Sequence, residues 1–141
     1  AEIKAQGMAA VEVTVNNSND VQQAVQSLAG RCEVIYLPTD NIISSSIAIV
    51  AEEAMKAGIP LSCGEEAQVK GGGTFTLGVS YFRLGEQTGQ MAARILKGET
   101  KVGEMPIQSQ TDFEFLINKT ACEALGLTIP EVLAAFAVDV K

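Results

Sequence analysis

The sequence of 141 residues contains no histidine and no tryptophan. Without histidine, the chain cannot build a Ser-His-Asp or Cys-His catalytic set, nor the usual zinc sites, which rely on imidazole ligands. Its three cysteines, Cys32, Cys63 and Cys122, form no Cys-x-x-Cys motif, so thioredoxin-type and metal-ribbon sites are excluded as well. We therefore expect small buried thiols, no metal site and no cofactor.

Positive charge and long apolar runs are also scarce. The chain has 10 basic and 17 acidic residues, a net charge of −7, and such a surface repels the phosphate backbone of nucleic acids. No apolar run approaches the roughly 18 residues needed to span a bilayer, and no signal peptide is visible. Residues 1–7 predict the last turns of a helix that ends at Gly7. We therefore expect the chain to be a piece of a longer protein that binds no nucleic acid.

Short apolar segments alternate with amphipathic ones along the chain. This alternation of strands and helices predicts an α/β fold with three layers around a mostly parallel sheet. The predicted strands are residues 11–15, 34–37, 59–63, 75–79 and 113–117, and the predicted helices are 21–28, 45–56, 84–96, 119–125 and a last one that opens at 128–131.

Polar residues follow three of the predicted strands, at Asn16–Ser18, Thr39–Asn41 and Gly64–Glu66. Ligands of open parallel sheets bind outside the carboxyl ends of the strands. Free backbone N–H groups there attract a carboxylate and acidic side chains attract an ammonium, so a zwitterion such as an amino acid would fit. The same residues could simply cap helices, and Asp40 with Glu65 could serve acid–base catalysis. The residue pattern leaves these alternatives open.

Five groups of residues carry a resemblance that covers the chain in unbroken order. They are Val11–Val15 with Asn17–Ala24, Tyr36–Asn41, Glu65–Glu66 with Val69–Gly72, Leu77–Val79 with Leu84–Gly89 and Met91–Gly98, and Leu125–Pro130. In these segments the chain is similar to ABC-transporter substrate-binding proteins of the tryptophan/tyrosine-transport type, which have the type I periplasmic-binding-protein fold.

The resemblance implies a two-lobed parent protein with a ligand cleft between the lobes. Residues 1–64 would belong to the second lobe and start inside its first helix. Residues 65–105 would form the hinge and the return into the first lobe, and residues 106–141 the crossover back to the second. The chain would thus be a fragment that comprises most of the second lobe.

The resemblance also implies a function and a set of ligand-binding residues. The chain would capture a small ligand, an amino acid with the aromatic ones among the candidates, and deliver it to a permease with its ATPase. The expected ligand-binding residues are Thr39, Asp40, Asn41, Glu65 and Ser80, with Asp40 holding the ammonium. Many relatives carry Asp-Tyr-Tyr where this chain has Ser80–Phe82.

Such a protein would be no enzyme. It would lie outside the cytoplasm, in the periplasm or as a membrane-anchored lipoprotein, peripheral to the membrane. The isolated chain would associate with itself, because surfaces normally covered by the other lobe would be exposed. Two alternatives remain: the ligand-sensing core of a lac-repressor-like regulator, and an α/β enzyme that uses Asp40 and Glu65.

Overall fold

A five-stranded sheet organises the structure, a computed structural model that describes residues 2–140. The strands lie in the order β1-β2-β3-β4-β5, and only β3 and β4 pair antiparallel. Their bounds are β1 Ile35–Leu37, β2 Leu61–Glu65, β3 Phe75–Val79, β4 Glu114–Asn118 and β5 Ala137–Val138. The predicted α/β class with a mostly parallel sheet is confirmed.

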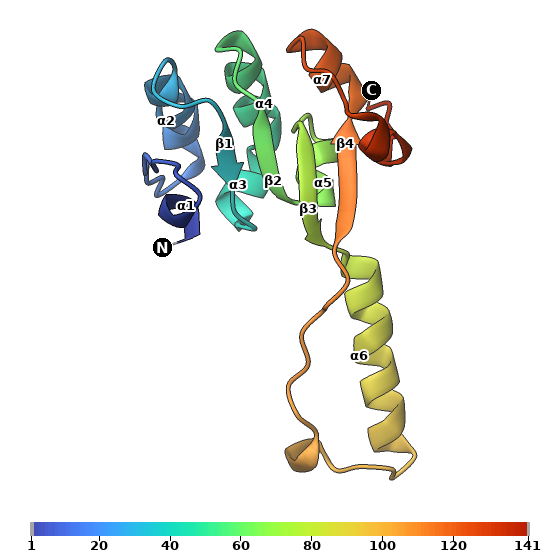
Figure 1. Ribbon diagram of the computed structural model, residues 1–141. Coiled ribbons are helices and arrows are strands. Elements are labelled where there is room, and N and C mark those ends of the chain that lie inside the picture. The colour runs from blue at the N-terminus through green and yellow to red at the C-terminus, as the bar shows by residue number, and fades with distance from the viewer. Residues whose placement is uncertain (1, 141) are drawn as a thin grey trace.

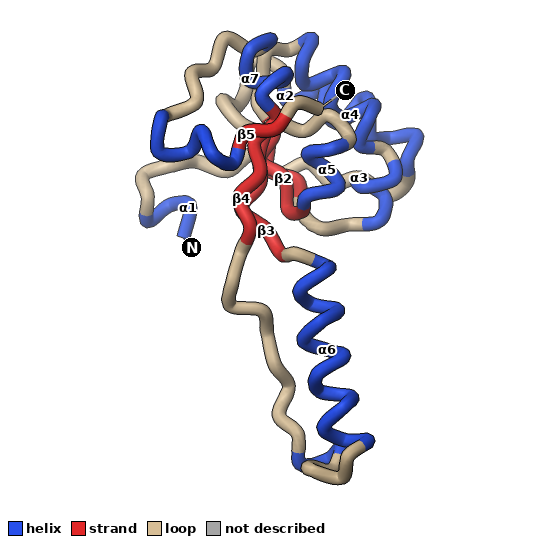
Figure 2. The backbone as a smooth tube through the Cα atoms, turned by 90° about the vertical axis from the view of Figure 1, so that its right-hand side faces the viewer, coloured by secondary structure: helices blue, strands red, loops and turns tan. Residues whose placement is uncertain are grey.

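Helices lie on both sides of this sheet, as Figure 2 shows, with α3, α4 and α5 on one side and α1 on the other. The α-helices are α1 Glu2–Ala5, α2 Val21–Leu28, α3 Asn41–Ser45, α4 Ile47–Lys56, α5 Glu66–Lys70, α6 Tyr81–Leu96 and α7 Lys119–Ala124. Three 3-10 helices complete the set: η1 Ser18–Asp20, η2 Val102–Glu104 and η3 Glu131–Phe136. The elements are therefore layered on the sheet as expected, with the side that carries α1 only sparsely covered.

The hydrophobic core lies between the sheet and the helices α2, α4 and α5. On α2, Val21, Val25 and Leu28 are buried because they recur on one face of the helix. On β1, Ile35 and Leu37 face this core. The buried residues of the core cluster are Val21, Val25, Leu28, Ile35, Leu37, Val50, Ala54, Ile59, Leu61, Cys63 and Val69.

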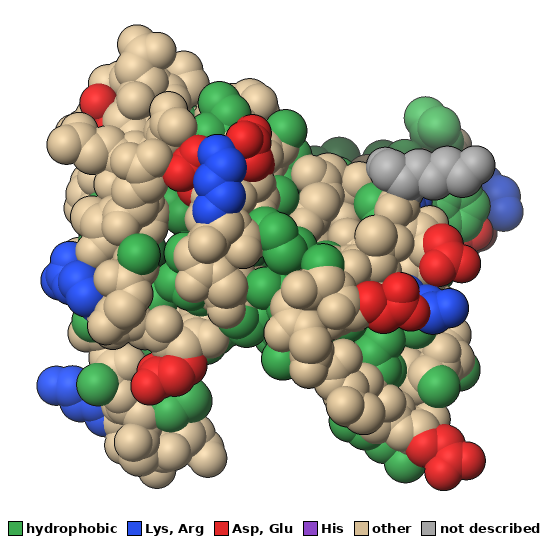
Figure 3. Space-filling view, turned by 90° about the horizontal axis from the view of Figure 1, so that it is seen from above, with side chains coloured by type: hydrophobic (Ala, Val, Ile, Leu, Met, Phe, Trp, Pro, Cys, Tyr) green, Lys and Arg blue, Asp and Glu red, His purple; other side chains and the backbone are tan. Residues whose placement is uncertain are grey.

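The opposite face of the sheet is bare over β1 to β3. Tyr36 and Leu77 point to this face, and they are 67% and 57% exposed. The N-terminal segment with α1 stands at one side of the bare face and η3 at the other (Figure 1). Seen from above, the molecule is hollowed between two projections, and hydrophobic side chains line the hollow (Figure 3). The third layer is therefore incomplete.

Between β3 and β4 the chain leaves the sheet as a long arm, residues 80–113, that projects away from the other elements (Figure 1). The arm consists of α6, η2 and an extended return segment. No residue of α6 is buried, although Leu84, Met91 and Ile95 recur on one stripe. None of the described helices combines the length and hydrophobicity that crossing a bilayer requires.

The strand predicted at residues 11–15 is wrong. These residues form no regular secondary structure and pair with no strand. An apolar groove with a volume of about 530 Å³ lies along them, and Val11, Val13 and Val15 line it together with Ile35 and Leu37 of β1. A strand needs a neighbour within about 5 Å for its hydrogen bonds, and the groove occupies that place.

Three other predicted elements have different bounds for local reasons. The strand predicted at 59–63 begins only at Leu61, because Ile59 N–H donates to Ala54 O (2.9 Å) and thus closes α4. The helix predicted at 45–56 is interrupted at Ser46, which separates α3 from α4. The last helix is the 3-10 helix η3, which ends where Ala137 pairs with Ile117.

Candidate functional site

The five predicted ligand-binding residues lie at one edge of the sheet, where the arm departs. Strands β1, β2 and β3 run parallel, so their carboxyl ends share that edge. Thr39, Asp40 and Asn41 follow β1, Glu65 is the last residue of β2, and Ser80 follows β3. We call this group the strand-end site. Its members come from three segments that are up to 41 positions apart in the sequence (80 − 39).

The loop after β1 contributes Asp40, which serves as the N-cap of α3. Its Oδ1 accepts hydrogen bonds from the backbone N–H groups of Ile42 (2.8 Å) and Ile43 (3.1 Å). This arrangement explains why α3 begins at Asn41 and confirms the capping alternative for Asp40. The side chain is exposed, and no bond to its Oδ2 forms among residues 2–140. One carboxylate oxygen therefore stays available to a ligand.

Glu65 is far less accessible than Asp40. Only 6% of the residue is exposed, and its Oε1 accepts a hydrogen bond from Ser44 Oγ at 2.8 Å. Within residues 2–140, no Lys or Arg nitrogen lies within 4.0 Å of its carboxylate. The neighbouring Glu66 instead forms an ion pair with Lys70. The two adjacent glutamates therefore have different partners, and only Glu65 belongs to the site.

Gln68 and Ser44 also belong to this site, and the sequence did not point to either of them. Gln68 is completely buried, and its Nε2 donates to Pro38 O (2.9 Å) and to Ser44 Oγ (3.1 Å). Its Oε1 accepts from Gly64 N–H at 3.0 Å. The sequence hints at a role for Gln68 in this site only through its spacing, because Gln68 follows Glu65 by three positions. A glutamine in a helix is usually solvated, and only the packing of α5 against β2 buries this one.

Ser80, Gly64 and Gly78 lie at this edge of the sheet, where the arm begins. Ser80 is buried as the N-cap of α6, with its Oγ 3.5 Å from the backbone nitrogen of Arg83. A Cβ at Gly78 would lie 2.5 Å from the carbonyl oxygen of Gly64, and one at Gly64 would lie 2.9 Å from Thr39 N. The strand ends therefore approach each other more closely than any larger residue would allow.

One of the three polar segments that the sequence predicted to follow strands does not belong to this site. In the predicted Asn16–Ser18 group, Asn17 caps η1 by accepting from Asn19 N–H (2.9 Å), and its Nδ2 donates to Asp20 (2.8 Å). The capping alternative is confirmed for Asn17. No cluster of three or more potential metal-ligating side chains occurs within the described residues.

The two buried cysteines are not suited to react with a ligand. Burial raises the pKa of the Cys63 thiol from 9.0 to about 12, and burial likewise raises the pKa of Cys122. Thiols in this state are not nucleophiles at neutral pH. The expectation of buried thiols is confirmed for these two, whereas Cys32 is half-buried.

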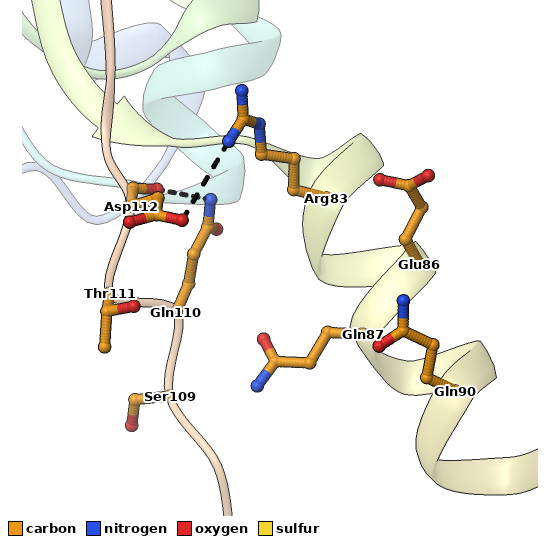
Figure 4. Close-up of a pocket in the computed structure, with 8 residues that line it drawn as sticks. All are labelled: Arg83, Glu86, Gln87, Gln90, Ser109, Gln110, Thr111 and Asp112. Carbon is orange, nitrogen blue, oxygen red and sulfur yellow. Dashed lines mark hydrogen bonds and ion pairs between the residues drawn. The ribbon is translucent and has the colours of Figure 1, made fainter.

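A second, polar cavity lies on the arm, between α6 and the extended return segment (Figure 4). Its volume is about 270 Å³. Arg83 crosses its upper end, where it pairs with Glu114 (2.9 Å) and lies 4.0 Å from Asp112. None of the five predicted site residues lines this cavity. Its lining residues are Arg83, Glu86, Gln87, Gln90, Ser109, Gln110, Thr111 and Asp112.

Comparison with known families gives one match that covers the whole chain. The family model described as "ABC transporter substrate binding protein" matches residues 1–141. A "Tyrosine-binding protein" of Clostridioides difficile (strain R20291) is 37% identical over 117 residues, which are 83% of this chain and 34% of that protein.

Solved structures show the same relationship. A conserved domain protein from Vibrio cholerae superposes with a TM-score of 0.85 at 36% identity, over 99% of this chain and 47% of that one. An ABC domain from Streptococcus pneumoniae, solved in complex with L-Trp, superposes with a TM-score of 0.84 at 27% identity, over 98% of this chain and 46% of that one. The chain thus spans about half the length of these structures.

Proposed function

Because this chain belongs to the family of ABC transporter substrate-binding proteins, we propose that it captures an aromatic amino acid for an importer. The family consists of binding proteins and not of enzymes. The alternatives of a regulator core and an α/β enzyme find no counterpart among the similar proteins reported above. One relative is named for tyrosine and one structural neighbour holds L-Trp, and these two ligands support an aromatic amino acid here.

We place the ligand at the strand-end site. The observation that carries this placement is that the carboxylates of Asp40 and Glu65 lie at the ends of two neighbouring parallel strands, each with an oxygen that no described residue engages. These carboxylates suit the ligand's ammonium group. The side-chain amide of Asn41 suits its carboxylate, because it offers hydrogen-bond donors. The hydroxyl of Thr39 already donates to the carbonyl oxygen of Gly64 (3.5 Å), so Thr39 would border the ligand. Ser80 would border the ligand from the third strand.

We propose further that the strand-end site is one wall of a cleft between two lobes. The sheet with α2–α5 and α7 would be the second lobe, and the arm, residues 80–113, would reach into the first. This arm begins and ends later than the segment 65–105 expected from the sequence. We assign residues 65–79 to the second lobe because β3 pairs with β2 and α5 packs against both strands. The unpartnered stripe of Leu84, Met91 and Ile95 supports a buried place for α6 in a longer chain.

Ligand capture would then close the cleft. A ligand that contacts both lobes binds the closed form more tightly and shifts the equilibrium toward it, without any bond being made or broken. The closed form would deliver the ligand to a permease and its ATPase. Proteins of this family are typically extracytoplasmic, and we propose the periplasm or a lipid-anchored position at the membrane for this one.

Calorimetric titration of the full-length chain with the common amino acids tests the proposed function. We expect a dissociation constant below about 100 μM, or about −5.5 kcal/mol, for at least one aromatic amino acid. The variant Asn41→Ala should weaken that binding about tenfold, since it removes hydrogen bonds to a charged group.

A matched control is Asn19→Ala, which removes an exposed asparagine of η1 outside the strand-end site. It should bind as the unmodified protein does. If no amino acid binds below about 100 μM, or if the two variants lose affinity equally, the proposal is wrong.

A further inference from the structure

Glu65 is the residue of the strand-end site whose side chain is largely buried while one carboxylate oxygen, Oε2, has no partner among the described residues and stays open to solvent. It is 6% exposed, it accepts a single hydrogen bond, from Ser44 Oγ to Oε1, and within residues 2–140 no cation compensates its charge. A buried charge without such compensation is unfavourable, so a cation that arrives at Oε2 gains more free energy there than at an exposed carboxylate. Asp40 differs because it is exposed and already receives two backbone N–H groups.

The hydrogen bonds around Gln68 fix which group donates and which accepts in the bond that holds the Glu65 carboxylate. Gly64 N–H can only donate and Pro38 O can only accept, so the two ends of the Gln68 side-chain amide are fixed. Its Nε2 therefore donates to Ser44 Oγ, and the single hydroxyl hydrogen of Ser44 must point to Glu65 Oε1. The chain Gln68–Ser44–Glu65 thus has one direction, and each donor strengthens the next.

The same chain of bonds also connects the loop after β1 with the end of the neighbouring strand β2. Pro38 belongs to the loop after β1, Ser44 to α3, and Gly64 and Glu65 to the end of β2. The position of Glu65 relative to Asp40 and Asn41 is therefore set by partly buried hydrogen bonds. A small ligand that contacts both the loop after β1 and the end of β2 needs such a fixed spacing.

From these contacts we infer that Glu65, and not Asp40, receives the ligand's ammonium group, and that Gln68 and Ser44 are positioning residues that aim its carboxylate. The inference rests on the proposed function, since it assigns the ammonium within the same site. It makes the strand-end site selective for ligands that carry an amine next to their polar head.

The test compares two ligands in the full-length chain. One is whichever of L-tyrosine, L-tryptophan and L-phenylalanine binds most tightly, and the other is its deaminated analogue. Glu65→Gln should lower the affinity for the amino acid about tenfold to a hundredfold, because a charge-assisted bond is lost, and should leave the analogue within about twofold. Asp40→Asn, which keeps the N-cap, should retain the preference for the amine.

Ser44→Ala tests the positioning role without removing a fully buried side chain. It should lower the preference for the amine by a smaller factor of about five, and Ser44→Thr, which keeps the hydroxyl, should restore it. If Ser44 had only a structural role, Ser44→Ala would lower the affinity for both ligands equally. The control is Glu66→Gln, the adjacent glutamate paired with Lys70, which should change neither affinity.

Different results would overturn the proposed function and the assignment of the ammonium group to Glu65. If the unmodified chain binds no amino acid, the proposed function is wrong and this inference falls with it. If the chain binds an amino acid but Glu65→Gln keeps the preference for the amine, or Asp40→Asn abolishes it, only the assignment of the ammonium to Glu65 is overturned.

Discussion

Two buried glutamates show how the surroundings of a residue separate structural from functional roles. Glu53 lies between α2 and α4 and accepts hydrogen bonds from Lys56 Nζ (2.9 Å), Gln26 Nε2 (2.8 Å) and Gln22 Nε2 (3.0 Å). Its carboxylate is fully engaged, so we assign it to holding the two helices together. Glu65 has one bonded oxygen and one free oxygen, and that difference makes it a candidate for binding.

The first prediction concerns the acid stability that Glu53 confers. Hydrogen bonds from Lys56, Gln26 and Gln22 lower the pKa of Glu53 from 4.5 to about 2 in the folded chain. Because the folded-state pKa is the lower one, this stabilisation is present above about pH 4.5 and is lost as the pH falls toward 2. Glu53→Gln should therefore lower the melting temperature at pH 7 and flatten its decline between pH 5 and pH 2.

The control for Glu53 is Glu52→Gln. Glu52 also pairs with Lys56 (2.7 Å), but its side chain is 66% exposed, so its loss should have little effect. Thermal melts followed by circular dichroism over the pH series decide the matter. Equal losses in the two variants would contradict the structural role of Glu53.

At the scale of elements, the contact between β2 and β3 determines where the arm begins. The register between these strands shifts between Cys63 and Glu65, beside the close approach of Gly64 and Gly78. Past this point Ser80 caps α6, and the chain leaves the sheet until Glu114. The strand-end site and the base of the arm are consequently the same place.

The second prediction follows from that close approach. Gly78→Ala would place a Cβ 2.5 Å from the carbonyl oxygen of Gly64, which is backbone and cannot rotate away. We expect destabilisation by about 1–3 kcal/mol, the usual effect of overpacking. Gly89→Ala on α6 meets nothing within 4 Å and should instead stabilise the chain by about 0.5–1 kcal/mol. Denaturant melts of both variants test this contrast, and a neutral Gly78→Ala would contradict it.

At the scale of the whole molecule, residues 2–140 leave several large apolar surfaces uncovered. They are the bare sheet face with Tyr36 and Leu77, the groove beside β1, and the arm with Phe82 (77% exposed). Surfaces of this kind are normally covered in a soluble protein. Their number agrees with a chain that spans about half the length of its structural neighbours.

The third prediction is that the 141-residue chain by itself associates in solution. Sedimentation velocity over a range of protein concentrations should show species larger than 14.8 kDa, and Leu77→Gln on the bare sheet face should reduce their amount. The full-length chain, with these surfaces covered, should associate less. A clean monomer with cooperative unfolding would count against the prediction.

The sequence alone determined the features that depend on local order. Apolar residues at period two and at helical spacing predicted the α/β class, and polar residues after the strands predicted a shared edge for Asp40 and Glu65. Local order could not determine whether residues 11–15 form a strand, since a strand requires a partner and an apolar groove lies in its place. Nor could it reveal the bonds from Gln68 through Ser44 to Glu65, which join residues up to 30 positions apart. Burial and pairing arise only when distant segments meet, and they decided which of the two candidate carboxylates is largely buried.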